Sequence, residues 1–269
     1  MSKVIVLHGT GRSGTTVLNN ILVNHPDLAW LSNYQVYALR FPILSFLNRF
    51  VSHSIDLNST TRGRFRVHSS NEPYAMWRKF YPNFQDDVDE PTGTPFRLQK
   101  YVDKIAMFAG KKKNVTKITG LSRANFLAHA FEDYQVVWID RDPRAVVCSM
   151  MKQRWFFRKK ATEFDAMDNF EKISFYCNYY KNVLASKADI PADKLINVRY
   201  EDLVANPAGF FEELTQKLSL SQSESFNRTI KNWQIDPIDG AYYQKQFSAA
   251  EWDFMNELLE IENQANFED

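Results

Sequence analysis

Residues 3–24, KVIVLHGTGRSGTTVLNNILVN, form the stretch that decides the fold. Residues 3–8 are a short apolar run that predicts a β-strand, and residues 17–22 place apolar side chains at the spacing of one helix face. Gly9, Gly11 and Gly14 lie between the two segments. A strand, a glycine-rich turn and a helix start together favour an anion site, because the first helical N–H groups and the helix dipole point at the turn.

The glycine spacing resembles the phosphate-binding loop of nucleoside triphosphatases, but one position differs. That pattern requires a lysine directly after the second glycine, and Thr15 occupies this position. The positive charge comes instead from Arg12, inside the loop. A planar guanidinium can hold an oxyanion at two points, so the loop indicates a site for a phosphate-like group.

Residues 9–28, GTGRSGTTVLNNILVNHPDL, resemble the 5′-phosphosulfate loop of the sulfotransferase superfamily. That family transfers a sulfuryl group from 3′-phosphoadenosine-5′-phosphosulfate (PAPS) to a hydroxyl or an amine. The chain departs from the family at Thr10-Gly11, where a proline is common before the arginine. The resemblance implies that Arg12 is catalytic and that the loop binds PAPS through Gly11, Arg12, Ser13, Gly14, Thr15 and Thr16.

A second cofactor-binding cluster is implied by the middle of the chain. Residues 135–140, QVVWID, are an apolar run without alternation, which favours a parallel strand buried on both faces. The resemblance implies that Arg141 at the end of this strand and Ser149 on the following helix bind the 3′-phosphate of PAPS. A guanidinium and a hydroxyl so placed can converge on one phosphate.

Two further site residues follow from the resemblance. Tyr200 begins the segment YEDL and is expected beside the adenine. Lys117, in a predicted strand, is the candidate for a second catalytic cation that reaches the transferred group. Within a strand, Lys117 can equally be an edge residue that extends its amine to solvent.

The general base has no clear candidate. Many family members carry a catalytic glutamate after the loop arginine, but the corresponding neighbourhood reads Ser32, Asn33 and Tyr34. Sulfuryl transfer requires a group that accepts the acceptor's proton. The candidates lie in the proposed acceptor region, and each can equally be an ordinary surface residue: His53, His68 and Glu72.

Predicted strands alternate with predicted helices, and four strands matter for the site: 3–8, 115–119, 135–140 and 195–200. This order predicts an α/β fold with a central parallel β-sheet flanked by helices, a three-layer sandwich like that of P-loop NTPases. Ligands of such folds bind at the carboxyl ends of the strands, where the candidate residues lie. We expect residues 1–269 to form one sulfotransferase-like domain, with an acceptor-region insertion around residues 35–110.

Local patterns predict several further elements. Apolar residues between 37 and 50 suggest a helical segment, and residues 96–109 predict an amphipathic helix ended by Gly110. Residues 28–30 are a candidate strand. Residues 168–187 predict a helix, whose inward side chains are expected to be Phe170, Ile173, Cys177 and Leu184.

The composition is typical of a globular protein, with 44% hydrophobic and 24% charged residues. A net charge of +1 gives no support for a nucleic-acid partner. Cys148 and Cys177 are expected to be reduced, buried thiols. We find no signal peptide before residues 3–8 and no transmembrane run, and therefore expect a cytoplasmic protein.

Three hypotheses for the function remain open. The first is a PAPS-dependent sulfotransferase without a metal, since no His/Cys cluster suggests one. The second is a P-loop small-molecule kinase, in which Asp140 at a strand end would bind magnesium. The third, motivated by the missing glutamate, is a non-catalytic relative that binds PAPS or its product, 3′,5′-adenosine bisphosphate (PAP). A small molecule, a carbohydrate or a lipid could be the acceptor, and the sequence leaves the oligomeric state open.

Overall fold

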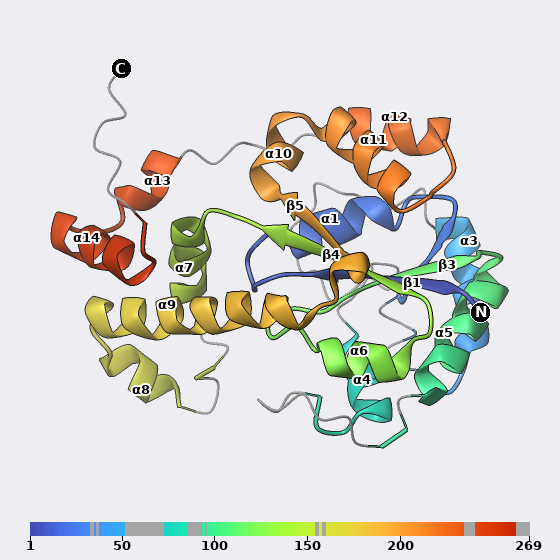
Figure 1. Ribbon diagram of the computed structural model, residues 1–269, viewed down its shortest axis with the longest axis horizontal. Helices are drawn as coiled ribbons and strands as arrows, with labels where there is room; N and C mark the ends of the chain where they lie inside the picture. The colour runs from blue at the N-terminus through green and yellow to red at the C-terminus, as the bar shows by residue number, and fades with distance from the viewer. Residues whose placement is uncertain are drawn as a thin grey trace.

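The computed structural model describes residues 1–32, 35, 38–51, 73–84, 93–94, 96–153, 156–157, 160–233 and 240–261. Its centre is a five-stranded sheet in the order β2-β3-β1-β4-β5, with every neighbouring pair parallel (Figure 1). The strands are β1 (Lys3–His8), β2 (Leu28–Ala29), β3 (Lys113–Lys117), β4 (Tyr134–Asp140) and β5 (Leu195–Arg199). This sheet confirms the predicted α/β fold class.

Helices cover both faces of the sheet. Figure 1 shows α1 and α10–α12 on one side, and α4–α6 with α9 on the other. The helices are α1 (Thr15–Leu22), η1 (Pro42–Leu47), α3 (Asn48–Val51), α4 (Tyr74–Phe80), α5 (Phe96–Ala109), α6 (Ala124–Ala130), α7 (Pro143–Met151), α8 (Ala161–Ala166), α9 (Asn169–Ser186), η2 (Lys187–Asp189), η3 (Ala192–Lys194), α10 (Tyr200–Ala205), α11 (Pro207–Lys217), α12 (Glu224–Lys231), α13 (Gly240–Gln244) and α14 (Ala249–Leu258).

The alternation of side chains along β1 divides the core into two layers. Val4 and Val6 join the cluster formed with α4, α5 and α6, whereas Ile5 and Leu7 join the cluster formed with α1, α11 and α12. All four side chains are fully buried. A strand buried on both faces has no polar positions, which is why β1 reads as a continuous apolar run.

Several local predictions are confirmed and two need adjustment. The helix of residues 96–109 has the predicted bounds, and Gly110 follows it with φ +69°. β3 lies two residues earlier than predicted, because it pairs with β1 from Lys113 onward. The prediction that Phe170 and Leu184 point inward on α9 is wrong: they are 42% and 39% exposed, and the buried stripe ends at Val183.

Cys148 and Cys177 are buried and unpaired, as predicted. Burial raises the pKa of both thiols to about 12, so neither is a reactive thiolate at neutral pH. Within the part of the chain that the structure describes, no helix is both long and apolar enough to cross a bilayer.

His8 is a buried, neutral histidine directly beneath the glycine-rich loop. Its Nδ1 accepts from the Gly9 N–H at 2.7 Å, and its Nε2 lies 3.1 Å from the Leu121 carbonyl oxygen. These two partners fix the neutral tautomer with the proton on Nε2. The ring also stacks on Trp138, with centroids 4.6 Å apart. The pKa of His8 is lowered from 6.5 to about 3, mainly by burial and in smaller part by the positive charge of Arg123.

We predict that this histidine makes stability depend on pH. The unfolded chain binds a proton near pH 6.5 that the folded chain does not bind until about pH 3. The contribution of His8 to the free energy of unfolding is therefore fully present above the pKa of the unfolded chain. It falls by about 1.4 kcal/mol for each pH unit below that pKa. Denaturant unfolding of wild type and His8→Gln at about pH 7 and about pH 5 measures the two slopes. The wild type should lose more stability; equal slopes would show that His8 carries no such contribution.

Gly14 allows close contact between the loop and a second strand end. Its φ is +104°, and an added Cβ would lie 2.4 Å from Cδ2 of Tyr200. Gly120 has a similar φ of +101°, but there the nearest atom to an added Cβ is the Tyr179 hydroxyl at 3.2 Å. The two glycines thus share a backbone conformation and differ in the space around them.

We expect Gly14→Ala to cost more stability than Gly120→Ala. Both variants place a Cβ in the left-handed region, at a cost of about 1–2 kcal/mol. Only Gly14→Ala must also displace a packed aromatic ring, which adds roughly 1–3 kcal/mol. Thermal unfolding of the two variants measures the difference. Equal losses would mean that Tyr200 is not held against the loop.

Candidate active site

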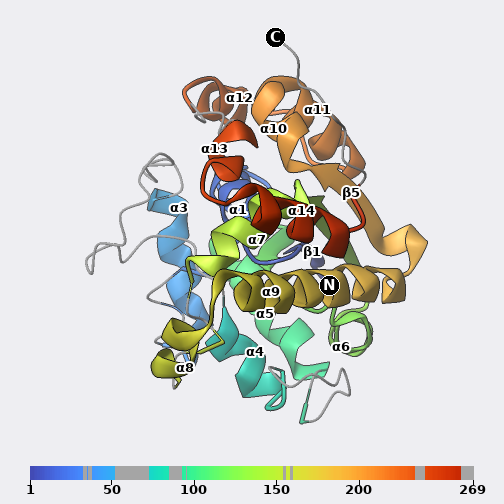
Figure 2. The ribbon, with the colours of Figure 1, turned by 90° about the vertical axis from the view of Figure 1, so that its left-hand side faces the viewer.

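The carboxyl ends of the strands gather the candidate residues at one side of the sheet. In Figure 1 the arrowhead of β4 points toward α7, and Figure 2 views the molecule from that side. The glycine-rich loop follows β1, Arg141 follows β4, and Tyr200 follows β5. Because parallel strands end at a common edge, three segments far apart in the sequence meet there.

The loop between β1 and α1 is closed by its own hydrogen bonds. The Ser13 hydroxyl donates to the Thr10 carbonyl at 2.7 Å, and Ser13 is fully buried. Gly14 is the N-cap residue of α1 and has no side chain with which to cap it. The first N–H groups of α1 therefore face the loop, where an anion can accept from them.

Arg12, inside this loop, has an unusual backbone conformation. Its φ is +74°, a conformation that non-glycine residues rarely adopt and that is typical of functional sites. The side chain is exposed, and its Nε donates to the Ser149 hydroxyl at 2.8 Å. The loop and helix α7 are thus in direct contact.

Arg141 connects the same loop to β5 and to the carboxyl-terminal helices. Its Nη1 donates to the Arg12 carbonyl at 3.1 Å, and its guanidinium lies 4.3 Å from the centroid of the Tyr200 ring. The structure therefore brings together Arg12, Arg141, Ser149 and Tyr200, which the sequence resemblance had selected from separate segments.

Lys117 lies at the end of β3 and reaches the start of α1. Its Nζ donates to the Thr16 hydroxyl at 2.9 Å, and its residue is 7% exposed. β3 is an interior strand between β2 and β1, so the alternative of an edge residue extending to solvent is wrong. Thr16 itself is exposed, whereas Thr15 and Gly11 are buried.

Two residues of the cluster were not predicted. The Tyr243 hydroxyl on α13 accepts from Arg141 Nη2 at 2.8 Å. Burial raises the pKa of Tyr243, although Arg141 opposes this, so its hydroxyl keeps a proton to donate. Glu201 accepts from the Asp142 N–H at 2.8 Å and fixes the turn after Arg141. The YEDL segment could have indicated Glu201, but no pattern in the sequence indicates Tyr243.

The kinase hypothesis proposed that Asp140 binds magnesium, but the structure shows other partners for this side chain. Asp140 Oδ1 accepts from the Trp138 indole at 2.9 Å, and Oδ2 pairs with Lys187 at 2.7 Å. Both carboxylate oxygens thus have partners in the fold, and neither partner belongs to the glycine-rich loop. Among the described residues, no three His, Cys, Asp or Glu side chains form a potential metal site.

The three candidates for the general base, His53, His68 and Glu72, lie outside the described residues. Ser32 is buried, and its hydroxyl donates to Gln35 Oε1 at 2.9 Å. Asn33 and Tyr34, which stand with Ser32 where many family members carry the glutamate, also lie outside the described residues. The base therefore stays unassigned.

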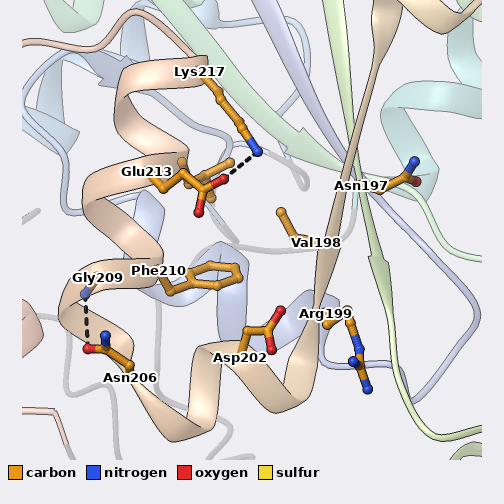
Figure 3. A pocket seen from close by; sticks show the side chains of 10 residues that line it. Asn197, Val198, Arg199, Asp202, Asn206, Gly209, Phe210, Glu213 and Lys217 are labelled. Carbon is orange, nitrogen blue, oxygen red and sulfur yellow. Dashed lines mark hydrogen bonds and ion pairs between the residues drawn. The ribbon is translucent and has the colours of Figure 1, made fainter.

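A separate hollow of about 380 Å³ lies beside the edge strand β5, between that strand and α11 (Figure 3). Its lining includes Arg199, Asp202 and an ion pair between Lys217 and Glu213 at 2.6 Å. Neither the loop nor Arg141 lines it. We place the candidate site at the strand ends, because the anion-binding groups converge there.

Comparisons with known proteins agree with this geometry. The family model described as "Sulfotransferase family" matches residues 4–224. The omega-hydroxy-beta-dihydromenaquinone-9 sulfotransferase Stf3 of Mycobacterium bovis is 21% identical over 262 residues, spanning 87% of this chain and 67% of that protein.

Solved structures share the fold at low sequence identity. Sulfotransferase STF9 from Mycobacterium avium has a TM-score of 0.61 at 15% identity, covering 96% of this chain and 76% of that chain. Sulfotransferase STF1 from Mycobacterium tuberculosis has the same TM-score at 16% identity, with the same coverage. Together with the family match, which spans most of the chain, these findings confirm the predicted superfamily and its fold. The chain belongs to the sulfotransferase family, the enzymes that transfer a sulfuryl group from PAPS to an acceptor.

Proposed function

We call Arg12, Arg141, Ser149 and Tyr200, together with the glycine-rich loop, the strand-end cluster. We propose that this cluster binds both phosphate groups of PAPS and that Arg12 and Lys117 act on the transferred group. The observation that carries this proposal is the 2.8 Å contact between Arg12 and Ser149. The 5′-phosphosulfate and the 3′-phosphate belong to one ribose, so their binding groups must be neighbours. Arg141, which donates to the Arg12 carbonyl at 3.1 Å, supplies the second guanidinium at the same place.

The residues present fit this ligand. The loop offers backbone N–H groups at the start of α1, a glycine at the N-cap and an exposed guanidinium, which are donors suited to an anion. Gly11, Ser13, Gly14 and Thr15 would contribute through the backbone and Thr16 through its hydroxyl. Tyr200, held between Gly14 and Arg141, would provide the aromatic surface beside the adenine.

PAPS supplies the sulfuryl group, whose bond to the 5′-phosphate breaks as the acceptor oxygen or nitrogen bonds to sulfur. Negative charge then grows on the phosphate, and Arg12 is placed to stabilise it more strongly than in the ground state. Lys117 adds a second positive charge at the start of α1. These cations take the place of a metal, so the proposed reaction is metal-independent. The proton of the acceptor goes to the unassigned base.

The acceptor is proposed to approach from the side of α4. The Tyr74 hydroxyl lies 3.1 Å from the Thr119 hydroxyl, just beyond the carboxyl end of β3. This contact places the described residues 73–84 of the expected acceptor region beside the strand ends. The name of the mycobacterial relative supports a lipid as the first acceptor class to assay, with carbohydrates and other small molecules next. The expectation of a cytoplasmic location stays a prediction.

We expect Arg12→Ala to lower the transfer rate by ~10²–10³, because a preorganised charged donor is lost. Arg12→Lys keeps the charge without the fork and should recover only part of the rate. Transfer of labelled sulfate from PAPS to a panel of lipid and carbohydrate acceptors, with EDTA present, measures these rates. Arg228→Ala, an exposed arginine on α12, is the control and should behave as wild type.

Three outcomes would contradict the proposal. Full activity of Arg12→Ala would remove its mechanism. Loss of wild-type activity in EDTA, or activity with ATP in place of PAPS, would favour the kinase. Binding of PAP by calorimetry without turnover on any acceptor would favour the non-catalytic relative.

A further inference from the structure

The segment formed by η1 and α3 presents its apolar side chains to solvent. Large hydrophobic residues are exposed along it in close succession, with the following fractions: Phe41 58%, Ile43 56%, Phe46 44%, Leu47 43% and Phe50 70%. We call these five residues the apolar face. Side chains of this size are usually buried, and an exposed group of them marks an interaction site.

The opposite side of the same segment carries buried polar side chains. A surface helix usually buries its apolar side chains and exposes its polar ones. Ser45 is fully buried, and its hydroxyl proton is within hydrogen-bond distance of two carbonyl oxygens, that of Ile105 at 2.9 Å and that of Pro42 at 2.8 Å. Asn48 is 4% exposed and donates to the Trp30 carbonyl at 2.8 Å. The contacts with Ile105 and Trp30 anchor the segment to α5 and to the end of β2. They fix its rotation so that the apolar face must point outward.

The charged side chains within the segment that carries the apolar face are both arginines. Arg40 and Arg49 are exposed, and the Arg49 guanidinium lies 5.1 Å from the centroid of the Phe46 ring. Residues 28–51 contain no Asp or Glu. Arginine beside exposed aromatic rings is the pattern that binds the interface of a bilayer with anionic headgroups, where the rings enter the acyl boundary and the cations meet the phosphates.

We propose that the apolar face docks this protein on the surface of bilayers that contain anionic phospholipid. The segment lies beside α5, on the side of the molecule away from α14 (Figure 1), so docking leaves the strand-end cluster uncovered. The inference goes beyond sulfuryl transfer and does not depend on it. Where the acceptor is a lipid, docking also brings the enzyme to the membrane that holds it.

The test is co-sedimentation of the full chain with vesicles of phosphatidylcholine and phosphatidylglycerol, compared with phosphatidylcholine alone. The double variant Leu47→Ser/Phe50→Ser should lose at least about tenfold in partitioning to the anionic vesicles. The matched control Leu184→Ser/Phe170→Ser removes the same residue types, 39% and 42% exposed, from α9 and should bind as wild type. Circular dichroism melting checks that both variants fold.

Two further measurements make the result decisive. Arg40→Gln/Arg49→Gln should abolish the preference for anionic vesicles. Phe50→Trp, which conserves the apolar face, should show an emission shift to shorter wavelength when vesicles are added, beyond any shift of wild type. The proposal is overturned if wild type does not sediment with anionic vesicles, or if the apolar-face double variant binds as the control does. A wild-type dimer that Leu47→Ser/Phe50→Ser converts to a monomer, without vesicle binding, would instead identify a second copy of the chain as the occupant.

Discussion

The guanidinium of Arg141 holds the candidate site together. It donates to the carbonyl of Arg12 and to the hydroxyl of Tyr243, and it stacks on the ring of Tyr200. One side chain thus joins the loop after β1, the helix α13 and the junction of β5 with α10. The planar fork also fixes the direction of each donor, so the loop and the aromatic ring keep a defined relative position.

Positive charge concentrated in this way has an electrostatic consequence. The Arg12 guanidinium extends from the loop to Ser149, the Arg141 guanidinium reaches the Arg12 carbonyl, and the helix dipole of α1 adds a partial positive charge. Like charges held together by the fold repel one another until an anion lies between them. His8 contributes to the loop without adding to this repulsion, because burial keeps its ring neutral while it still accepts from Gly9. The proposed binding groups are therefore held close together by contacts within the protein itself.

Hydrogen bonds to neighbouring elements also hold the outer segment of η1 and α3. Two buried polar side chains, Ser45 and Asn48, find carbonyl partners on neighbouring elements, so their burial is satisfied by hydrogen bonds. The apolar side chains are left outside, and the charged residues among residues 28–51 are arginines. Exposed aromatic rings lose the free energy of burial. For stability alone, burying the apolar side chains of this segment and exposing its polar ones would be the better arrangement.

The sequence by itself determined the elements whose signals are local. The apolar runs of β1 and β4 were readable because both faces of these strands are buried, and the bounds of α5 followed from its periodicity and Gly110. Resemblance to known sulfotransferases selected Arg12, Arg141, Ser149 and Tyr200, but that they touch follows only from the common edge at which parallel strands end. Only the tertiary structure shows Tyr243 against Arg141. The contact joins positions about a hundred residues apart, and no periodic pattern in the sequence indicates it. It also decided which side of the segment near Phe50 faces outward: the pattern predicted a helix, while its rotation was set by the distant carbonyls of Ile105 and Trp30.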